Sequence, residues 1–207
     1  QLNGFKSFAE KTNFLIEDGL TGIVGPNGCG KSNIVESLRW CMGETSAKSM
    51  RGSGMEDVIF SGTSNKPSKN IAEVSINLSN ENKDGPHQYN ELDDIEIRRK
   101  IEKDKGSKFY INGKEVRAKD AQMFFADLST GAHSPSIISQ GRIGALVTAK
   151  PSDRRAILEE AAGIAGLHAR RHEAELRLNA AENNLKRADE LRRQQEKQLA
   201  NLQKQAE

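Results

Sequence analysis

The chain has 207 residues, a net charge of +2 and a hydrophobic share of only 35%, so it can build one ordinary core but not a core along its whole length. It contains no stretch near the ~20 consecutive apolar residues of a membrane span, and its polar first residues carry no signal-peptide pattern. Two cysteines, Cys29 and Cys41, make neither a metal spacing nor a disulfide framework, so we expect a cytosolic protein without membrane contact.

Short apolar runs and turn signals alternate in the first part of the chain. The runs at 2–8, 14–17 and 20–25 predict short strands, and the last of them reads as a buried strand. The stretch 31–42 predicts a helix. Its expected apolar face consists of Ile34, Val35, Leu38 and Cys41.

Two further strands and a hairpin are predicted from the alternation of apolar and polar residues. Residues 72–78 and 95–101 alternate as strands with one buried face, and 109–116 reads as a hairpin. Asn112 and Gly113 supply the two positive φ angles of a type I′ turn. The remaining segments are a glycine-rich loop at 50–54, a surface loop at 80–94 and a short helix at 121–128.

The composition changes near residue 150. Residues 151–207 contain no aromatic residue and only two of the 18 glycines, and they predict one long helix after a lobe that spans residues 1–150. A heptad register from Arg171 has apolar residues at eight of eleven positions, which is typical of a coiled coil, although Arg192 and Gln195 interrupt it. The partner helix must come from sequence outside this chain. The apolar positions are Ala174, Leu178, Ala181, Leu185, Ala188, Leu199, Leu202 and Ala206.

A phosphate-binding loop lies between the run at 20–25 and the helix at 31–42. It matches the pattern G-x-x-x-x-G-K-[ST] at every fixed position. The glycines let the backbone wrap an anion, Lys31 reaches the β- and γ-phosphates, and the Ser32 hydroxyl is a ligand for Mg²⁺. The matching residues are Gly25, Pro26, Asn27, Gly28, Cys29, Gly30, Lys31 and Ser32.

Two residues near this chemistry have more than one interpretation. Cys29 is either a reactive thiol at a helix N-terminus or a small side chain tolerated at a variable position. Gln140 follows an apolar run, and its amide can bind Mg²⁺ and orient a water molecule, but a surface glutamine fits the composition as well.

Several segments, taken together, resemble the structural-maintenance-of-chromosomes (SMC) family, in the order in which the family carries them. They are GFKSF at 4–8, GPNGCGKSN at 25–33, RG at 51–52, MEDVIFSGT at 55–63, ISQG at 138–141 and EEAAGI at 159–164. The resemblance covers nearly the whole chain.

The resemblance implies an α/β fold, namely the N-terminal half of an ABC-type P-loop ATPase head, with a mixed sheet and a P-loop helix, followed by a long coiled-coil helix. It implies ATP and Mg²⁺ as ligands, with Lys31 and Ser32 as Walker A residues and Gln140 as the Q-loop glutamine. Arg51 matches the family's R-loop arginine, which reaches toward nucleotide phosphate; without the resemblance it reads as an ordinary loop cation. Further nucleotide contacts implied in the same way are Lys6, Ser7, Asn33 and Asp57.

A DNA contact has less support in the sequence than the phosphate site has. Gly54 stands where relatives can carry a lysine in the arginine loop. A basic cluster either touches the DNA backbone or is a solvated charged face balanced by nearby acids. It consists of Arg98, Arg99, Lys100, Lys103, Lys105 and Lys108.

The chain carries no Asp-Glu motif of the Walker B kind and no Leu-Ser-Gly-Gly signature. Family members carry both after a hinge and a returning coil, so we expect this chain to need a C-terminal half and to hydrolyse almost no ATP alone. The resemblance implies a homodimer of two heads that ATP joins and hydrolysis releases, weak DNA binding, and nucleoid-associated work in chromosome condensation and segregation.

A neck at the start of the long helix is a candidate docking surface for a kleisin subunit, or it faces only the returning helix. Its residues are Ala174, Leu178, Ala181 and Leu185. The competing functions are a DNA-repair ATPase head of the RecN or zinc-hook kind, and a small P-loop kinase or GTPase with a helical tail.

Overall fold

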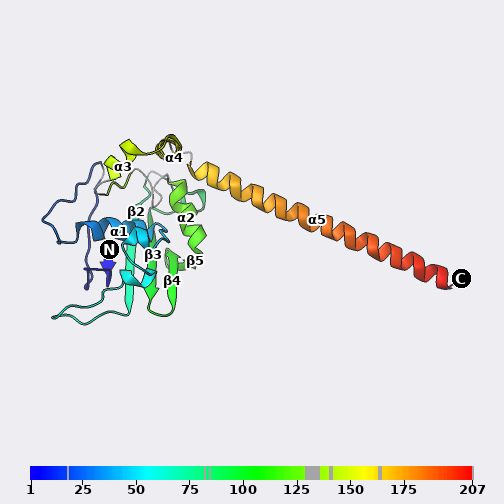
Figure 1. The fold of residues 1–207 in the computed structure, drawn as a ribbon, viewed down its shortest axis with the longest axis horizontal. Coiled ribbons are helices and arrows are strands. Elements are labelled where there is room, and N and C mark those ends of the chain that lie inside the picture. The colour runs from blue at the N-terminus through cyan, green and yellow to red at the C-terminus, as the bar shows by residue number, and fades with distance from the viewer. Residues whose placement is uncertain are drawn as a thin grey trace. The chain divides into compact units, whose positions relative to one another are not determined.

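A five-stranded sheet organises the first of the two units into which the chain divides, Gln1–Gly166 and Leu167–Glu207. The computed structural model describes residues 1–17, 19–81, 83, 85–128, 136–139, 142–162 and 165–206. Neighbouring strands pair in the order β1-β2-β3-β4-β5, antiparallel throughout (Figure 1). The strands are β1 (Leu2–Asn3), β2 (Ile71–Ser79), β3 (Asp94–Glu102), β4 (Gly106–Ile111) and β5 (Lys114–Val116).

The predicted strands at 72–78 and 95–101 and the hairpin at 109–116 are confirmed. β2 and β3 pair along their full lengths, and their alternating residues separate a core face from an outer face. Asn112 and Gly113 have φ angles of 48° and 78°, which is the backbone that a type I′ turn requires between β4 and β5.

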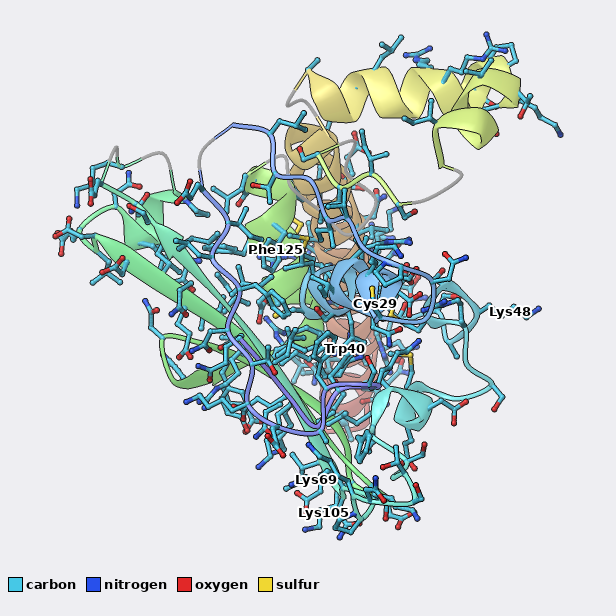
Figure 2. All side chains as sticks on the ribbon, turned by 90° about the vertical axis from the view of Figure 1, so that its left-hand side faces the viewer. Cys29, Trp40, Lys48, Lys69, Lys105 and Phe125 are labelled. Atoms are coloured by element: carbon cyan, nitrogen blue, oxygen red, sulfur yellow. The ribbon has the colours of Figure 1, made fainter. Side chains whose placement is uncertain are left out.

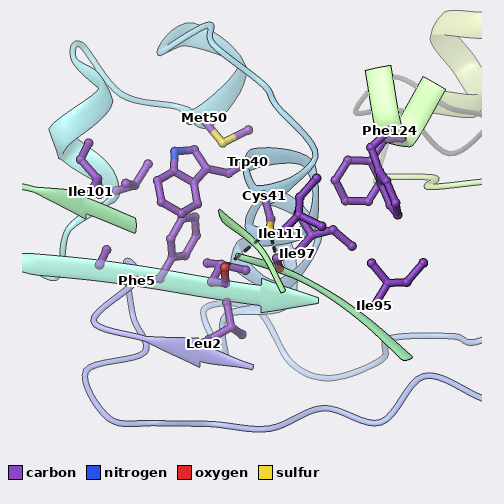
Figure 3. Close-up of a cluster of buried hydrophobic side chains, with 14 residues drawn as sticks. Leu2, Phe5, Trp40, Cys41, Met50, Ile95, Ile97, Ile101, Ile111 and Phe124 are labelled. Carbon is purple, nitrogen blue, oxygen red and sulfur yellow. Dashed lines mark hydrogen bonds between the residues drawn. The ribbon is translucent and has the colours of Figure 1, made fainter. Parts of the chain in front are cut away.

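Two helices cover the core face of this sheet. α1 (Lys31–Cys41) contacts β2 and β3, and α2 (Ala118–Asp127) contacts β4. Figure 3 shows Trp40 of α1 against Phe5, with ring centroids 5.4 Å apart, and Phe124 of α2 beside the isoleucines of the sheet. The predicted helices at 31–42 and 121–128 therefore exist, the second starting three residues earlier than expected.

The buried face of α1 differs from the predicted apolar face. Its four buried residues are Glu36, Ser37, Trp40 and Cys41, whereas three of the four expected ones, Ile34, Val35 and Leu38, are only partly buried. The helix is oriented so that Trp40 fills the core, and the Glu36 carboxylate on the same side is therefore buried as well. A buried carboxylate needs partners, and these are given with the site below.

The strand predictions near the N-terminus are wrong over most of their length. In 2–8 only Leu2–Asn3 is strand, because the chain turns at Lys6, whose φ is 45°. Residues 14–17 and 20–25 form no strand, and Leu20 and Val24 are 99% and 91% exposed. A strand needs a neighbour for its backbone groups, and no described strand pairs with these residues.

The prediction of one unbroken helix over 151–207 is also wrong. α4 (Pro151–Ala161) gives way to a turn at Ala162, and α5 (Ala165–Ala206) follows. Gly163 and Ile164, between the two helices, lie outside the described residues. A short helix, α3 (Arg142–Thr148), precedes both and was not predicted. None of the described helices is both long enough and apolar enough to cross a membrane.

Candidate functional site

The phosphate loop leads directly into α1. Gly28 and Gly30 have φ angles of 82° and 94°, a backbone region that residues with side chains rarely adopt. The Lys31 ammonium, at the first position of α1, donates to the carbonyl oxygens of Gly25 at 2.6 Å and Pro26 at 2.5 Å. The loop thus holds its lysine at a helix N-terminus, where backbone N–H groups attract anions.

The Cys29 side chain lies on the surface of this loop. Figure 2 shows it beside α1, with Lys48 projecting from a neighbouring segment, the 3₁₀ turn η1 (Lys48–Met50). Its sulfur is 4.0 Å from the Lys31 ammonium, and a β-carbon on Gly25 would come within 2.9 Å of it. Glycine at 25 therefore leaves the room that the cysteine occupies.

A tight turn near the N-terminus packs against the end of the phosphate loop. Phe5 and Phe8 exchange backbone hydrogen bonds of 3.1 and 2.8 Å, which places Lys6 and Ser7 at the tip. A β-carbon on Gly30 would come within 3.0 Å of the Ser7 hydroxyl. The turn and the loop approach this closely because residue 30 has no side chain.

Contacts among five side chains join this turn to α1 and to the segment after η1. Asn33 donates its amide to the Ser7 hydroxyl at 2.8 Å and accepts from Arg51 Nη2 at 2.8 Å. Arg51 Nε pairs with Glu36 Oε1, and the Lys6 ammonium pairs with Glu36 Oε2 at 2.5 Å. Lys6 and Ser7 are adjacent in sequence, so the contacts close into a ring, which we call the Glu36 ring (Ser7, Asn33, Arg51, Glu36 and Lys6).

The charges of this region fit a phosphate-rich ligand. Three cations, Lys6, Lys31 and Arg51, stand near the loop, and the Glu36 carboxylate pairs with two of them. Lys31 bonds to neutral carbonyl oxygens in the contacts above, and the Arg51 side chain is 57% exposed. A surplus of positive charge beside a helix N-terminus is what nucleotide phosphates require.

Glu36 is a residue of the site that the sequence pattern did not single out. The sequence placed Glu36 neither on the apolar face of the helix nor among the site residues. It is nevertheless only 7% exposed, and it pairs with two expected site residues, Lys6 and Arg51. The available signal was an acid three residues after Asn33, since side chains at i and i+3 share a helix face. That signal becomes useful only if Lys6 and Arg51 are known to lie nearby.

Asp57 lies in η2 (Met55–Val58) and is not a member of the Glu36 ring. Its Oδ2 accepts hydrogen bonds from Gly54 N at 3.0 Å and from Ser53 N and Oγ at 2.6 and 2.8 Å. The Gly54 backbone contact, followed by the two from Ser53, lowers the pKa of Asp57. In these contacts Asp57 shapes the turn after Arg51.

The remaining predicted residues are placed as follows. Ser32 is exposed in the first turn of α1, next to Lys31. Gln140 lies outside the described residues. The four neck residues lie on α5 and are exposed: Ala174, Leu178, Ala181 and Leu185.

The basic cluster does not form one surface, because Arg99 is buried in the core. It is 3% exposed, and its guanidinium lies 4.5 Å from the ring centroid of Trp40 and 4.6 Å from that of Phe109. It donates to the carbonyl oxygens of Trp40 and Glu44, each at 2.7 Å. The expectation that Arg99 joins a DNA-facing or solvated face is therefore wrong; its place in β3 points it to the core face.

The other basic side chains of the cluster lie outside the core, and acids accompany several of them. Lys105 pairs with Glu102 at 2.7 Å, and Lys108 with Glu115 at 3.0 Å. Figure 2 shows Lys69 and Lys105 near one another, at the end of the sheet where β2 begins and β3 turns into β4. The paired charges fit a solvated face, the second of the two interpretations.

Comparison with known proteins places these features in a family context. Residues 1–142 match the family model described as the RecF/RecN/SMC N-terminal domain. The chain is 56% identical over 206 residues to the chromosome partition protein Smc of Rhodopseudomonas palustris, and the match covers 100% of this chain but 18% of that protein.

Two solved structures share the fold. One, from work on the ATP-driven dimerization and DNA-stimulated activation of SMC ATPases, has a TM-score of 0.65 at 32% identity and covers 77% of this chain and 95% of its own. The other is an Smc head domain from Pyrococcus furiosus with an extended coiled coil, bound to the C-terminal domain of ScpA. Its TM-score is 0.70 at 34% identity, over 92% of this chain and 47% of its own.

Proposed function

The chain belongs to the RecF/RecN/SMC N-terminal domain family, and on this premise we propose that it is the phosphate-binding half of an ATPase head in a chromosome-partitioning protein. The observation that carries the proposal is the phosphate loop, with Lys31 at the N-terminus of α1 and Lys6 and Arg51 beside it. Partitioning is favoured over DNA repair within the family because the 56% identity is to a chromosome partition protein.

Several residues of the site have a proposed task toward ATP. Lys31 leaves its two carbonyl partners to pair with the β- and γ-phosphates, and the N–H groups of the first turn of α1 bind the same negative charge. The Ser32 hydroxyl would hold Mg²⁺, which would supply positive charge to neutralise the phosphates. Arg51 adds a second cation beside the first turns of α1, where Asn33 and Glu36 hold it.

Three of the proposed tasks depend on the family resemblance more than on contacts. Gln140 is proposed to orient water and Mg²⁺, and Ser7 and Asp57 to contact the nucleotide. Ser7 has the stronger support, because its hydroxyl lies next to Gly30. Asp57 has the weaker support, because its carboxylate bonds to its own turn.

We propose that a C-terminal half completes this head and supplies the Walker B and signature residues. The support is the apolar segment 14–24, whose large apolar side chains are exposed to solvent although such residues are typical of a core. Large exposed apolar groups in one place indicate a contact surface. They are Phe14, Leu15, Ile16, Leu20, Ile23 and Val24. The chain alone is then expected to hydrolyse ATP slowly or not at all.

We also propose partners for this head, by analogy with the solved relatives. The head would form an ATP-dependent homodimer, in keeping with the ATP-driven dimerization described for one solved relative, and would bind DNA weakly. A kleisin would dock at the neck on α5, where Leu178 and Leu185 are 60% and 67% exposed. A partner at the head is supported by the solved relative that is bound to the C-terminal domain of ScpA. Residues 1–150 would form the lobe of the head, and residues 151–207 would begin a coiled-coil helix, which we call the arm.

The test is the variant Lys31→Ala in the whole protein. Loss of the loop side chain that reaches the phosphates is expected to abolish ATP hydrolysis and to weaken ATP binding at least tenfold. Titration with a fluorescent ATP analogue and a phosphate-release assay measure the two effects. Lys48→Ala, an exposed lysine on η1, is the matched control and is expected to behave as the parent protein. Unchanged ATP binding by Lys31→Ala would contradict the proposed function.

A further inference from the structure

We propose that Glu36 is a positioning residue for ATP binding: it orients the guanidinium of Arg51 through Nε, so that the other nitrogens of Arg51 face the first turn of α1. The inference rests on the proposed function, since it concerns how this chain receives phosphate. It assigns a role to a residue that the phosphate-loop motif does not include.

The first support is the burial of Glu36. A carboxylate that is 7% exposed loses most of its hydration, so it must be paired to remain charged inside a protein. Glu36 has both oxygens paired, one with Lys6 and one with Arg51. Neither partner is close in sequence, so the pairing ties two separate segments to one point on α1.

The second support is the asymmetry between the two cations. The Lys6 side chain is 13% exposed and also donates to the carbonyl oxygen of Met50, so its ammonium is committed to the fold. The Arg51 side chain is 57% exposed. Of the two cations that Glu36 holds, Arg51 is therefore the one that can meet a ligand.

The third support is the direction of the Arg51 fork. Its Nε is used on Glu36, and its Nη2 reaches Asn33, which is two residues after Lys31. A guanidinium is planar, so fixing Nε and one terminal nitrogen fixes the plane of the whole group. The plane is set beside the helix N-terminus, where phosphate oxygens would accept from it.

The backbone at Arg51 fits the same interpretation. Arg51 has a φ of 54°, a left-handed conformation that is uncommon for a residue with a long side chain. Such a conformation persists where surrounding contacts determine it, and it occurs often at ligand-binding sites. Here the backbone closes the C-terminal end of η1, with Arg51 N donating to the Lys48 carbonyl oxygen at 3.0 Å, and the Glu36 ring then holds the side chain.

The experiment is a double-mutant cycle in the whole protein, read as the affinity for a fluorescent ATP analogue with Mg²⁺. Glu36→Gln keeps the shape of the side chain and removes its charge, and it is expected to weaken binding about tenfold, or about 1.4 kcal/mol. In an Arg51→Gln background the same change is expected to have no further effect, because Glu36 acts through Arg51. A loss that persists undiminished in that background overturns the proposal, as does unchanged or tighter binding by Glu36→Gln.

A matched control separates positioning from general damage to α1. Glu44 is a second buried carboxylate, 4% exposed, which pairs with Arg39 at 3.2 Å and accepts from Ser46 N at the other end of the helix. Glu44→Gln is expected to lower thermal stability and to leave ATP affinity unchanged. If it weakens ATP binding as much as Glu36→Gln does, the effect is structural and the proposal is overturned.

A second variant keeps the test open if Glu36→Gln does not fold. Arg51→Lys changes an exposed side chain and keeps its charge. A lysine has only one side-chain nitrogen, so it cannot pair with Glu36 through one nitrogen and offer others to phosphate. It is expected to bind ATP as weakly as Arg51→Gln, and binding as tight as the parent's overturns the proposal. Failure of the parent protein itself to bind ATP would instead refute the proposed function.

Discussion

Arg99 carries a positive charge into the centre of the apolar core. Trp40 and Phe109 lie against the guanidinium, the Trp40 and Glu44 carbonyl oxygens accept from it, and the Ser107 hydroxyl accepts from Nε at 2.8 Å. Burial lowers the pKa of Arg99 to about 10. The arginine thereby donates to one carbonyl oxygen in the last turn of α1 and to one in the segment that follows the helix.

The two cysteines are expected to differ sharply in reactivity. Cys41 is fully buried, its thiol donates to the carbonyl oxygens of Val74 and Ile97, and burial raises its pKa to about 12. Cys29 is exposed. Iodoacetamide at pH 8 is therefore expected to modify Cys29 in the native protein and Cys41 only after unfolding, because the thiolate is the reactive form.

Peptide mapping by mass spectrometry measures this labelling directly. A reaction in denaturant, where both peptides should be modified, serves as the control. Native labelling of Cys41 at a rate close to that of Cys29 would mean that the core over α1 opens far more readily than its packing indicates.

Two glycines at the ends of elements offer a matched comparison of backbone and steric effects. Gly113, in the β4–β5 turn, and Gly4, after β1, both have positive φ angles, of 78° and 64°. A β-carbon at Gly113 would meet nothing within 4 Å, whereas one at Gly4 would overlap the carbonyl oxygen of Ile71 in β2. Gly113→Ala should therefore cost about 1 kcal/mol, and Gly4→Ala about 2 kcal/mol more.

Urea unfolding of the two variants, compared at equal slope, gives both costs. Equal destabilisation would indicate that β1 moves away from β2 at no cost, and that the short β1–β2 pairing contributes little to the sheet.

Elements whose determinants lie within a few residues were predictable, and those that depend on distant partners were not. The hairpin follows from Asn112-Gly113, and the phosphate loop from the spacing that ends at Lys31. The run at 20–25 has the composition of a buried strand, but no described strand pairs with it. Within the Glu36 ring, Lys6 and Glu36 are 30 positions apart, a pairing that no local pattern encodes.

At the scale of the whole molecule, α5 presents an apolar seam with no described partner. Leu185 lies on the seam predicted from the heptad register, and Leu176 lies off that seam; they are 67% and 54% exposed. A seam residue is buried when a second helix pairs with this one, whereas Leu176 stays in solvent. In the whole protein, Leu185→Glu is expected to destabilise the arm by about 2 kcal/mol and Leu176→Glu by much less.

Thermal melts followed by circular dichroism at 222 nm report on the arm in both variants. Equal melting of the two would mean that the heptad register, and with it the proposed coiled coil, is placed on the wrong face of α5.

The order of strands also has a consequence for how the protein folds. β2, β3, β4 and β5 are consecutive in sequence and adjacent in the sheet, so their contacts are local, and local contacts form quickly. During synthesis this meander can assemble as soon as it leaves the ribosome, whereas Leu2 must wait for Val74 before β1 can pair. We therefore expect the meander to be the folding nucleus, and the phosphate loop to pack against it later. On that route the apolar side chains of segment 14–24, which are synthesised before the meander, stay exposed while the sheet forms.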